Sequence, residues 1–414
     1  MHSLPMPITD VFVALADPRQ TNKVQHSLAE TLTVAVCGIL VGTDTFEEIQ
    51  AWAQEKQPWL RRYLELPNGI PSHDTFARLF ALIQPQAFES AFRRWVEAVL
   101  PALSPQVVAL DGKTSRRTAK AGEAALHLVS AFATDAGLIL GQQATAAKSN
   151  EKTAIPELLA TLALEGCVVT IDAMGTQPGI AQAIRKQKAD YVLAVKGNQP
   201  RLLESIKDFF ETFRKHAPER TPHGFCETLE KGHGRLEIRR CYVFDELACL
   251  AHPERWPDLG CFAVIESERH LQGKVSHERR YYISSLAPDA ERLASAIRQH
   301  WGIENRVHWC LDVVFADDQM RARTAHAAHN LATLKRLTLN LLRLDPSQRK
   351  GSLKTRRLIA NTSDDYRAEL LGLKCEGLAS CDCPVDRRVR FVPRVRHRCW
   401  ARGDGLTFGA AWTA

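Results

Sequence analysis

The spacing of hydrophobic residues predicts a helical first part of the chain. Apolar positions recur at intervals of three and four residues over 27–66, as in buried or amphipathic helices. Ser72 is suited to cap a further helix, whose apolar face would carry Phe76, Leu79 and Phe80. Another helix is expected over 88–100. We therefore expect residues 1–103 to form a helical domain.

From Val107 onward the pattern changes to short apolar strings that predict strands. VVALDG and VVTIDAMG are β-branched runs that end in Asp111 and Asp172. Between them, 126–134 and 138–145 predict two strands joined by a turn, and a helix follows at about 152–164. A helix at 180–188 and the strand YVLAVKGN complete the unit. This order predicts a mixed α/β sheet over 104–224 with helices on both faces.

The remaining part of the chain has a β-rich pattern, then a helical pattern, and ends in a tail. Residues 225–286 contain half-alternating strings without a helix between them, which predicts a β-rich insertion. Long helices are expected at 289–311 and 327–344, within a segment that extends to residue 373. The second helix would place its leucines on one face and its basic residues elsewhere, namely Lys335, Arg336 and Arg343. Residues 374–414 form a basic, cysteine-containing tail that we expect to be disordered.

Charge and cysteine content narrow the class of protein only slightly. The 414 residues carry a formal net charge of +7, which permits a nucleic-acid partner without requiring one. The eleven cysteines are scattered, mostly in apolar strings, as expected for thiols in a reducing cytoplasm. No stretch approaches the roughly 18 apolar residues that span a bilayer. We therefore expect a cytoplasmic protein with no membrane partner.

Three acidic residues are candidates for catalysis. Asp111 and Asp172 end predicted strands, and ligands bind at the carboxyl ends of strands in α/β sheets. A helical projection of HWGIENRVHW directs Glu304 inward among apolar residues. Buried carboxylates are costly unless they bind metal, and Mg²⁺ or Mn²⁺ prefers such oxygen ligands. Spacing alone does not separate this interpretation from three unrelated acids that cap helices or pair in turns.

A set of strings supplies the specificity that the spacing lacks. In this order the chain resembles insertion-sequence DDE transposases of the H-repeat-associated group in LDGKTSRR, HLVSAFAT, KSNEKTAIPELL, TIDAMGTQ, YVLAVKGNQP, KGHGRLEIRR, RYYISSL and HWGIENRVHWCLDVVFADD. The resemblance implies an RNase H-like core whose metal ligands, for two Mg²⁺ or Mn²⁺ ions, are Asp111, Asp172 and Glu304.

The same resemblance implies an activity and its partners. The enzyme would cut DNA at the terminal repeats of a mobile element and join the 3′-OH ends to target DNA by transesterification. It would act as a homodimer or higher oligomer on DNA. Two alternatives stay open: a DNA-binding remnant that no longer cuts, and a domesticated nuclease without strand transfer.

Several polar residues are expected to contact DNA near the strand ends. They are Lys113, Arg116, Lys148, Lys196 and Asn198, with His233 and Arg235 at a predicted hairpin tip. Broader relatives surround the glutamate with a Tyr, Arg and Lys signature that this chain lacks. The candidates for its phosphate-contacting role are Arg298, His300 and Arg306. We assign Trp301, Trp309 and His308 to helix packing rather than to base stacking or metal binding.

Two parts of the chain have open interpretations. The helical domain at 1–103 would bind the element's ends through arginines such as Arg78, Arg93 and Arg94, or would serve packing or dimerisation. The cysteines of the tail suggest a zinc cluster, but Cys381 and Cys383 are one residue apart instead of the usual two. A disordered extension is therefore the favoured interpretation of the tail.

Overall fold

A computed structural model describes most of the chain. The described residues are 6–100, 103–119, 122, 124–145, 151–216, 224–232, 234–345, 347 and 349–373. Lys148, His233 and the tail at 374–414 lie outside them, so the predictions made for these residues stay predictions.

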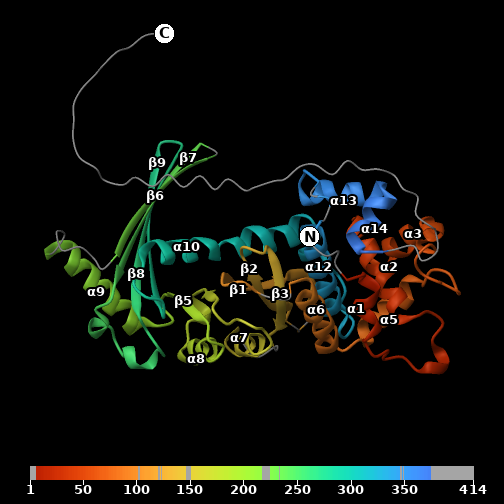
Figure 1. The fold of residues 1–414 in the computed structure, drawn as a ribbon, viewed down its shortest axis with the longest axis horizontal. Helices are drawn as coiled ribbons and strands as arrows, with labels where there is room; N and C mark the ends of the chain where they lie inside the picture. The colour runs from red at the N-terminus through yellow and green to blue at the C-terminus, as the bar shows by residue number, and fades with distance from the viewer. Residues whose placement is uncertain are drawn as a thin grey trace, which may run out of the picture. The chain divides into compact units, whose positions relative to one another are not determined.

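The centre of the fold is a nine-stranded mixed sheet (Figure 1). Its order is β3-β2-β1-β4-β5-β9-β8-β7-β6. β1, β4 and β5 are parallel, and every other neighbouring pair is antiparallel. The first five strands have the RNase H-like order that the resemblance implied, and their bounds are β1 Val107–Ser115, β2 Leu126–Ala133, β3 Leu138–Ala144, β4 Val168–Ile171 and β5 Asp190–Val195.

Helices cover both faces of this sheet, as the strand pattern predicted (Figure 1). α10 (Ala290–His300) buries Leu293 and Ile297 against one face, in a cluster that includes Val107 and Val168. The next residues along those strands, Val108 and Val169, face the opposite way into the larger core. α7 (Glu151–Leu159) and α8 (Pro178–Lys186) cover that side. Strand periodicity therefore divides the core into two layers.

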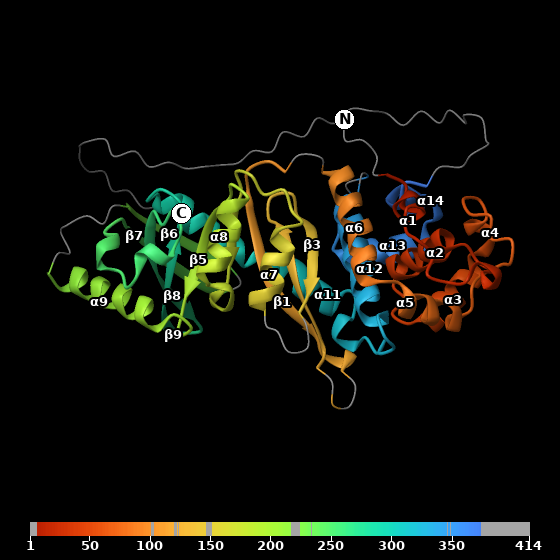
Figure 2. The same ribbon diagram turned by 90° about the horizontal axis from the view of Figure 1, so that it is seen from below.

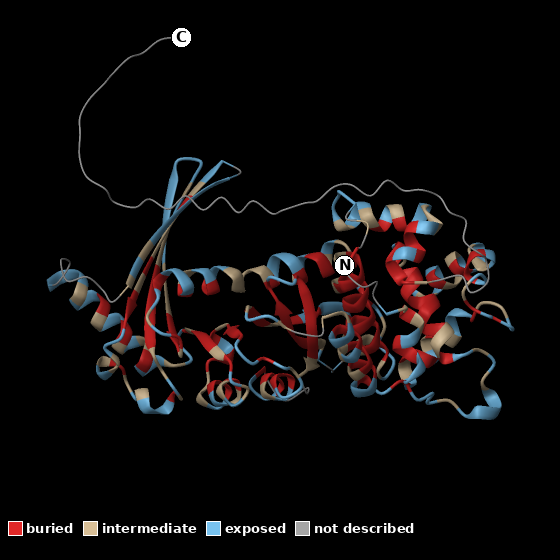
Figure 3. Ribbon diagram, viewed as in Figure 1, coloured by how far each residue is buried: buried red, intermediate tan, exposed pale blue. Residues whose placement is uncertain are grey.

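The β-rich insertion extends the central sheet instead of forming a sheet of its own. Its strands are β6 Gly224–Gly232, β7 Arg235–Phe244, β8 Cys261–Leu271 and β9 Lys274–Ser284. β9 joins it to the core by pairing with β5 from Val192↔Ser284 to Val195↔Tyr281. Sequence periodicity did not identify α9 (Pro200–His216). This helix packs phenylalanine side chains against the part of β7 near the core. The distal ends of the four strands, called the arm below, rise past α10 and are exposed (Figures 1 and 3).

The N-terminal helices share their core with the C-terminal ones. The first group is α1 Ile8–Val13, α2 Leu28–Val41, α3 Phe46–Glu55, α4 Gln57–Leu60, α5 His73–Leu82 and α6 Pro85–Val99. Ser72 caps α5 as predicted, accepting a hydrogen bond from the Thr75 N–H. The second group is α12 Ala327–Arg343, α13 Leu353–Thr362 and α14 Asp364–Leu371, which lie beside the first in Figure 2.

Two helices of this part are buried on nearly every side. α2 is buried along most of its length, and no single helix in the described ranges is long and apolar enough to cross a membrane, although α2 and α3 pass that test as a bent pair. In α12 the expectation of a separate basic face was wrong, because Lys335 and Arg336 are 1% and 0% exposed. Neighbouring elements enclose this helix, and local periodicity does not report such tertiary burial.

One amide side chain joins α12 to the edge of the sheet. Asn340 accepts a hydrogen bond from the Ile139 N–H at 3.0 Å and donates one to the Ile139 carbonyl at 2.9 Å. Both residues are fully buried. The side-chain amide of Asn340 thus pairs with two backbone groups on the outer edge of β3, where no neighbouring strand would satisfy them.

We predict that Asn340→Leu lowers the free energy of unfolding by about 2–5 kcal/mol, because two buried backbone groups lose their partners. Urea denaturation would measure the change. The control is Thr338→Val on the same buried helix, whose hydroxyl bonds only to the Leu334 carbonyl of its own helix. This control should cost less than about 1 kcal/mol. Equal losses in the two variants would contradict the proposed role of Asn340.

Candidate active site

The parallel pairing of β1 with β4 sets the position of the two aspartates. That pairing ends at Leu110↔Ile171, so the next residues, Asp111 and Asp172, lie side by side at the sheet's edge. Asp172 follows its strand and accepts a hydrogen bond from the Met174 N–H at 3.0 Å. The expectation that Asp111 also ends its strand was wrong. β1 continues to Ser115 because β2 still pairs with it up to Leu126.

Both aspartates line one pocket, and Glu304 lines the same pocket. The pocket has a volume of about 390 Å³ and lies between the sheet, the end of α10 and the inner part of β9. Besides the three carboxylates, its lining includes Thr170, Lys196, Arg280, Ile297, His300 and Trp301. The structure therefore brings the three predicted acids to the wall of the same cavity.

Burial and the charges of neighbouring carboxylates disfavour the ionised form of both aspartates in the absence of a cation. Burial first, and then the charge of Asp172, raise the pKa of Asp111 to about 7. Burial and the charge of Glu151 raise the pKa of Asp172. No Lys or Arg within the described ranges forms an ion pair with either carboxylate. This environment favours a bound divalent cation.

Glu304 is placed differently from the expectation. Its side chain is exposed at the pocket, and not directed into the apolar layer as the helical projection predicted. Glu304 begins a π-helical turn that runs to His308, between α10 and α11 (Trp309–Val313). A π turn shifts the residues that follow it relative to a 3.6-residue projection, and such turns are frequent at functional sites.

Glu278 also lines the pocket, and Glu151, outside the lining, is a further carboxylate whose charge acts on both aspartates and which sequence analysis missed. Glu151 begins α7, is buried, and contacts His127 Nε2 through Oε1 at 2.8 Å. A Cβ on Gly112 would lie 2.0 Å from Glu151 Oε1, so the glycine after Asp111 leaves room for this pair. An acid at a helix N-terminus is usually explained by the helix dipole. Its presence inside the resembling string KSNEKTAIPELL was the one available signal.

Two histidines of the catalytic helix face the site in neutral form. His300 hydrogen-bonds through Nδ1 with Thr170 Oγ1 at 3.0 Å, and burial lowers its pKa to about 4. His308 Nδ1 lies 3.4 Å from Asp111 Oδ2, and burial followed by the charges of Arg336 and Lys113 lowers its pKa to about 3. His308, which we assigned to packing, therefore also has a polar contact with β1, and His300, a candidate for phosphate contact, hydrogen-bonds to β4.

The donor set fits a divalent cation, although the side chains are not closed around one. No group of three or more His, Cys, Asp or Glu side chains within the described ranges is gathered closely enough to hold an ion. Asp111 and Asp172 are nevertheless adjacent and desolvated, neither forms an ion pair with a Lys or Arg of the described ranges, and Glu304 reaches the same cavity from the helix. Hard carboxylate oxygens of this kind suit Mg²⁺ or Mn²⁺.

Two of the predicted phosphate contacts belong to a structural network behind the pocket. Lys113 is buried in β1 and pairs with Asp312 at 2.6 Å and Asp318 at 3.5 Å. Arg116 is 82% exposed at its side chain and pairs with Asp318 at 3.4 Å. Lys113 therefore holds the segment after the catalytic helix against β1, whereas Arg116 remains accessible.

The other predicted contacts are dispersed. Lys196 lines the pocket, but Asn198 donates to the Ala173 carbonyl and so fixes the loop after Asp172. Arg298 pairs with Glu230 of β6 at 3.0 Å. Arg306 donates to the Thr134 carbonyl at 2.7 Å. Arg235 lies on the arm.

The two tryptophans near Glu304 are not equivalent. Trp301 is half-buried and lines the pocket, with the Arg280 guanidinium 4.4 Å from its ring centre. Trp309 is 58% exposed, so its assignment to helix packing was wrong. It follows the π turn, where the projected helical face no longer applies.

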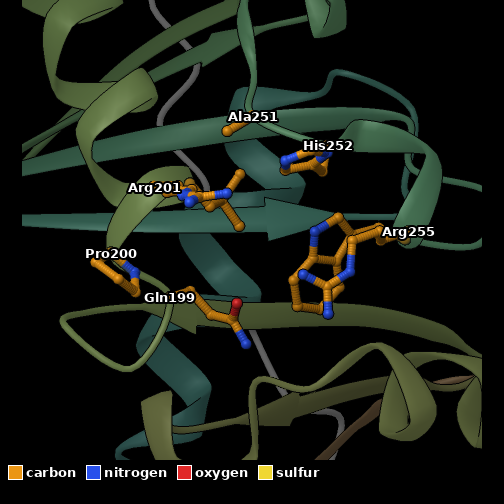
Figure 4. Close-up of a pocket in the computed structure, with 8 residues that line it drawn as sticks. Gln199, Pro200, Arg201, Ala251, His252 and Arg255 are labelled. Atoms are coloured by element: carbon orange, nitrogen blue, oxygen red, sulfur yellow. The ribbon is translucent and has the colours of Figure 1, made fainter.

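A second pocket has different chemistry. It has a volume of about 320 Å³ and lies between the start of α9 and residues 251–256 (Figure 4). Arg201, His252 and Arg255 contribute to its lining, and no carboxylate does. It therefore lacks the acids on which a catalytic metal site depends.

Together, the strand order and the acidic pocket at its central parallel strands define a protein of the RNase H-like fold class. Comparison with known families is more specific. The family model "Transposase DDE domain" matches residues 102–341, and "DDE_Tnp_1-associated" matches residues 9–96. The chain belongs to the family of transposases with this DDE domain, which confirms the resemblance.

The relatives agree with this assignment. The chain is 40% identical over 370 residues to "Putative transposase YncI" of Escherichia coli O157:H7, covering 88% of this chain and 94% of that protein. It is 37% identical to "H repeat-associated putative transposase YhhI" of E. coli K12, covering 86% and 95%. A solved piggyBac transposase synaptic complex matches 88% of this chain and 76% of that chain, with 10% identity and a TM-score of 0.40.

The raised pKa of Asp111 predicts how stability depends on pH. Between about pH 4 and about pH 7 the folded chain holds a proton that the unfolded chain has released, so stability falls as pH rises through this window. Asp111→Asn removes that penalty. In chelator-treated protein at pH 8 it should raise the free energy of unfolding, by at most about 4 kcal/mol, and at pH 4 it should have little effect.

Urea denaturation at the two pH values measures this effect. Asp312→Asn is the control of opposite sign, because it removes a partner of the buried Lys113 and should destabilise the protein. The interpretation would be wrong if Asp111→Asn lowered stability at pH 8 as much as Asp312→Asn does.

Proposed function

We propose that this chain is an active transposase that cuts DNA at the ends of a mobile element and joins the resulting 3′-OH ends to target DNA. Asp111, Asp172 and Glu304 would hold two Mg²⁺ or Mn²⁺ ions. When bound, such ions supply an activated attacking oxygen and stabilise the leaving oxygen in phosphodiester chemistry. The DNA partners would be the element's terminal repeats and the target.

The residues around the carboxylates support this proposal by orienting them. The hydrogen bond from the Met174 N–H fixes one oxygen of Asp172. His308 approaches Asp111 from the catalytic helix at 3.4 Å, so that helix is positioned directly against the first catalytic strand. Side chains around metal ligands commonly fix the orientation of those ligands in this way.

The observation that carries the proposal is the pair of desolvated aspartates directly after the last paired residues of the parallel strands β1 and β4, with Glu304 on the same cavity. Acids with a purely structural role would not need to be buried beside one another in a way that raises the pKa of Asp111. Perturbed carboxyl groups in a cleft are typical of functional sites. The DNA-binding remnant would not need to retain this costly arrangement.

We predict that Asp111→Asn, Asp172→Asn or Glu304→Gln abolishes cleavage and leaves binding to the element's ends largely intact. Each change preserves side-chain size and removes a ligand charge. The assay is cleavage and strand transfer with Mg²⁺ or Mn²⁺ on duplexes that carry the element's ends.

The control for this assay is Glu165→Gln, an exposed carboxylate that pairs with Lys188 away from the pocket. Its rate should match that of the wild type. Wild-type rates in any of the three site variants would refute the assignment of that residue. Cleavage without strand transfer in the wild type would favour the nuclease alternative.

We also propose that the helical part recognises the element's ends through exposed arginines. Arg78 of α5 and Arg94 of α6 are exposed, whereas Arg93 is partly buried and donates to Ser90. Because α2 and α5 share a core with α12, deletion of residues 1–100 would also damage the fold. Surface substitutions therefore give the clearer test.

The double variant Arg78→Ala/Arg94→Ala should reduce the preference for the element's end over unrelated DNA by roughly tenfold, as expected for the loss of base contacts. Competition mobility-shift assays measure this ratio. Lys23→Ala, another exposed cation of the helical part, should leave it unchanged. An unchanged ratio in the double variant would favour a packing or dimerisation role.

A further inference from the structure

The strand register of the arm separates its charged residues onto two faces. Side chains alternate along each strand, so each cross-strand row of β6–β9 belongs to one face. One face packs on α9, as the contacts of Tyr242 with Phe210 and Phe213 show. The other packs on α10, with Cys241 and Val243 in the shared cluster. We call them the α9 face and the α10 face.

The two faces carry equal numbers of acids but unequal numbers of bases. Within the described residues of β6–β9, each face has three Asp or Glu side chains. The α9 face has three Lys or Arg, which gives a net charge of zero with histidines neutral. The α10 face has five, which gives +2, and they are Arg235, Arg239, Arg269, Lys274 and Arg280.

A single buried carboxylate organises the basic residues of the α10 face. Glu237 is 5% exposed at its side chain and contacts three guanidinium groups. The distances are 2.5 Å to Arg239, 3.5 Å to Arg235 and 3.7 Å to Arg269. One negative charge thus fixes three positive ones. Arg239 also pairs with Glu230 at 3.2 Å, and Arg280 pairs with Glu278 at 2.8 Å. The excess positive charge of this face therefore lies toward the tip of the arm, at Arg235, Arg269 and Lys274.

These cations form a column that starts in the catalytic pocket. Arg280 lines the pocket, and Lys274 lies at the tip of the arm beside the β8–β9 turn. At about 3.3 Å per residue the column is roughly 20 Å long, which is the length of about six base pairs. Arg298 of α10 adds a further cation beside the column.

We propose that the α10 face of the arm binds the phosphate backbone of the duplex that enters the active site. This inference rests on the proposed function, which supplies DNA as the substrate, and adds the surface on which the duplex lies next to the reacting phosphodiester. The α9 face suits this role less well, because its net charge is zero. Guanidinium groups are well matched to phosphate.

Two exposed lysines at the tip provide a matched test. Lys274 belongs to the α10 face and Lys231 to the adjacent row of the α9 face. Lys274→Glu and Lys231→Glu make the same charge change in the full-length chain, and neither residue is buried. Circular dichroism would verify that both variants fold.

The measurement is fluorescence anisotropy with a labelled duplex of the element's end, over a range of salt concentrations. Lys274→Glu should weaken binding by about three- to tenfold and reduce the slope of log affinity against log salt by about one, because a phosphate contact is lost. Lys231→Glu should change both quantities much less. A photoreactive side chain at position 274 should crosslink to the duplex, and one at position 231 should not.

The outcomes separate this inference from the proposed function. If the wild type binds and cuts DNA but the two variants behave alike, the α10 face is not the DNA surface and the proposed function survives. Absence of DNA binding by the wild type would overturn both. If Lys274→Glu changes the mass of the assembly in solution and not its DNA affinity, the face is a contact between copies of the chain and the inference fails.

Discussion

The parallel pairing of β1 with β4 is the constraint on which the site depends. It aligns Leu110 with Ile171, so that Asp111 and Asp172 emerge at the same level and on the same edge. A shift of one residue in either strand would turn one carboxylate to the opposite face of the sheet. The alternation of Val107 and Val108 between the two hydrophobic layers fixes this register. The packing of the core therefore determines the geometry of the acids.

A second consequence concerns the cost of the buried acids. The charges of Asp172 and Glu151 raise the pKa of Asp111, and the charge of Glu151 raises the pKa of Asp172, which opposes folding near neutral pH. The network behind β1 works in the other direction. Lys113 pairs with Asp312, and Ser115 donates to the buried Asp317 at 2.7 Å. These contacts join the segment after Glu304 to the strand that carries Asp111. Asp111 and Asp172 therefore remain in one cavity despite their repulsion.

The sequence predicted most of this arrangement but failed where tertiary contacts override local pattern. Strand strings and their order predicted the mixed sheet, whereas the adjacency of Asp111 and Asp172 follows from the pairing of β1 with β4 in the structure. The exposed position of Trp309 was not predictable, because the π turn over Glu304–His308 precedes it and breaks the 3.6-residue period. Lys113 was expected near the end of its strand and in contact with DNA. Pairing with β2, a long-range contact, extends that strand to Ser115. Glu151 carried no pattern that distinguishes it from a helix-terminal acid.

The sharing of one sheet by the core and the arm has a mechanical implication. β9 pairs with β5 at Tyr281–Ser284 and continues outward as an edge of the arm, while its Arg280 contacts Trp301 at the end of α10. β5 in turn pairs with β4, which precedes Asp172. A force on the arm would thus reach the strand before Asp172 through continuous backbone hydrogen bonds, and the helix before Glu304 through Trp301. The arm and the acids are therefore expected to move as one body.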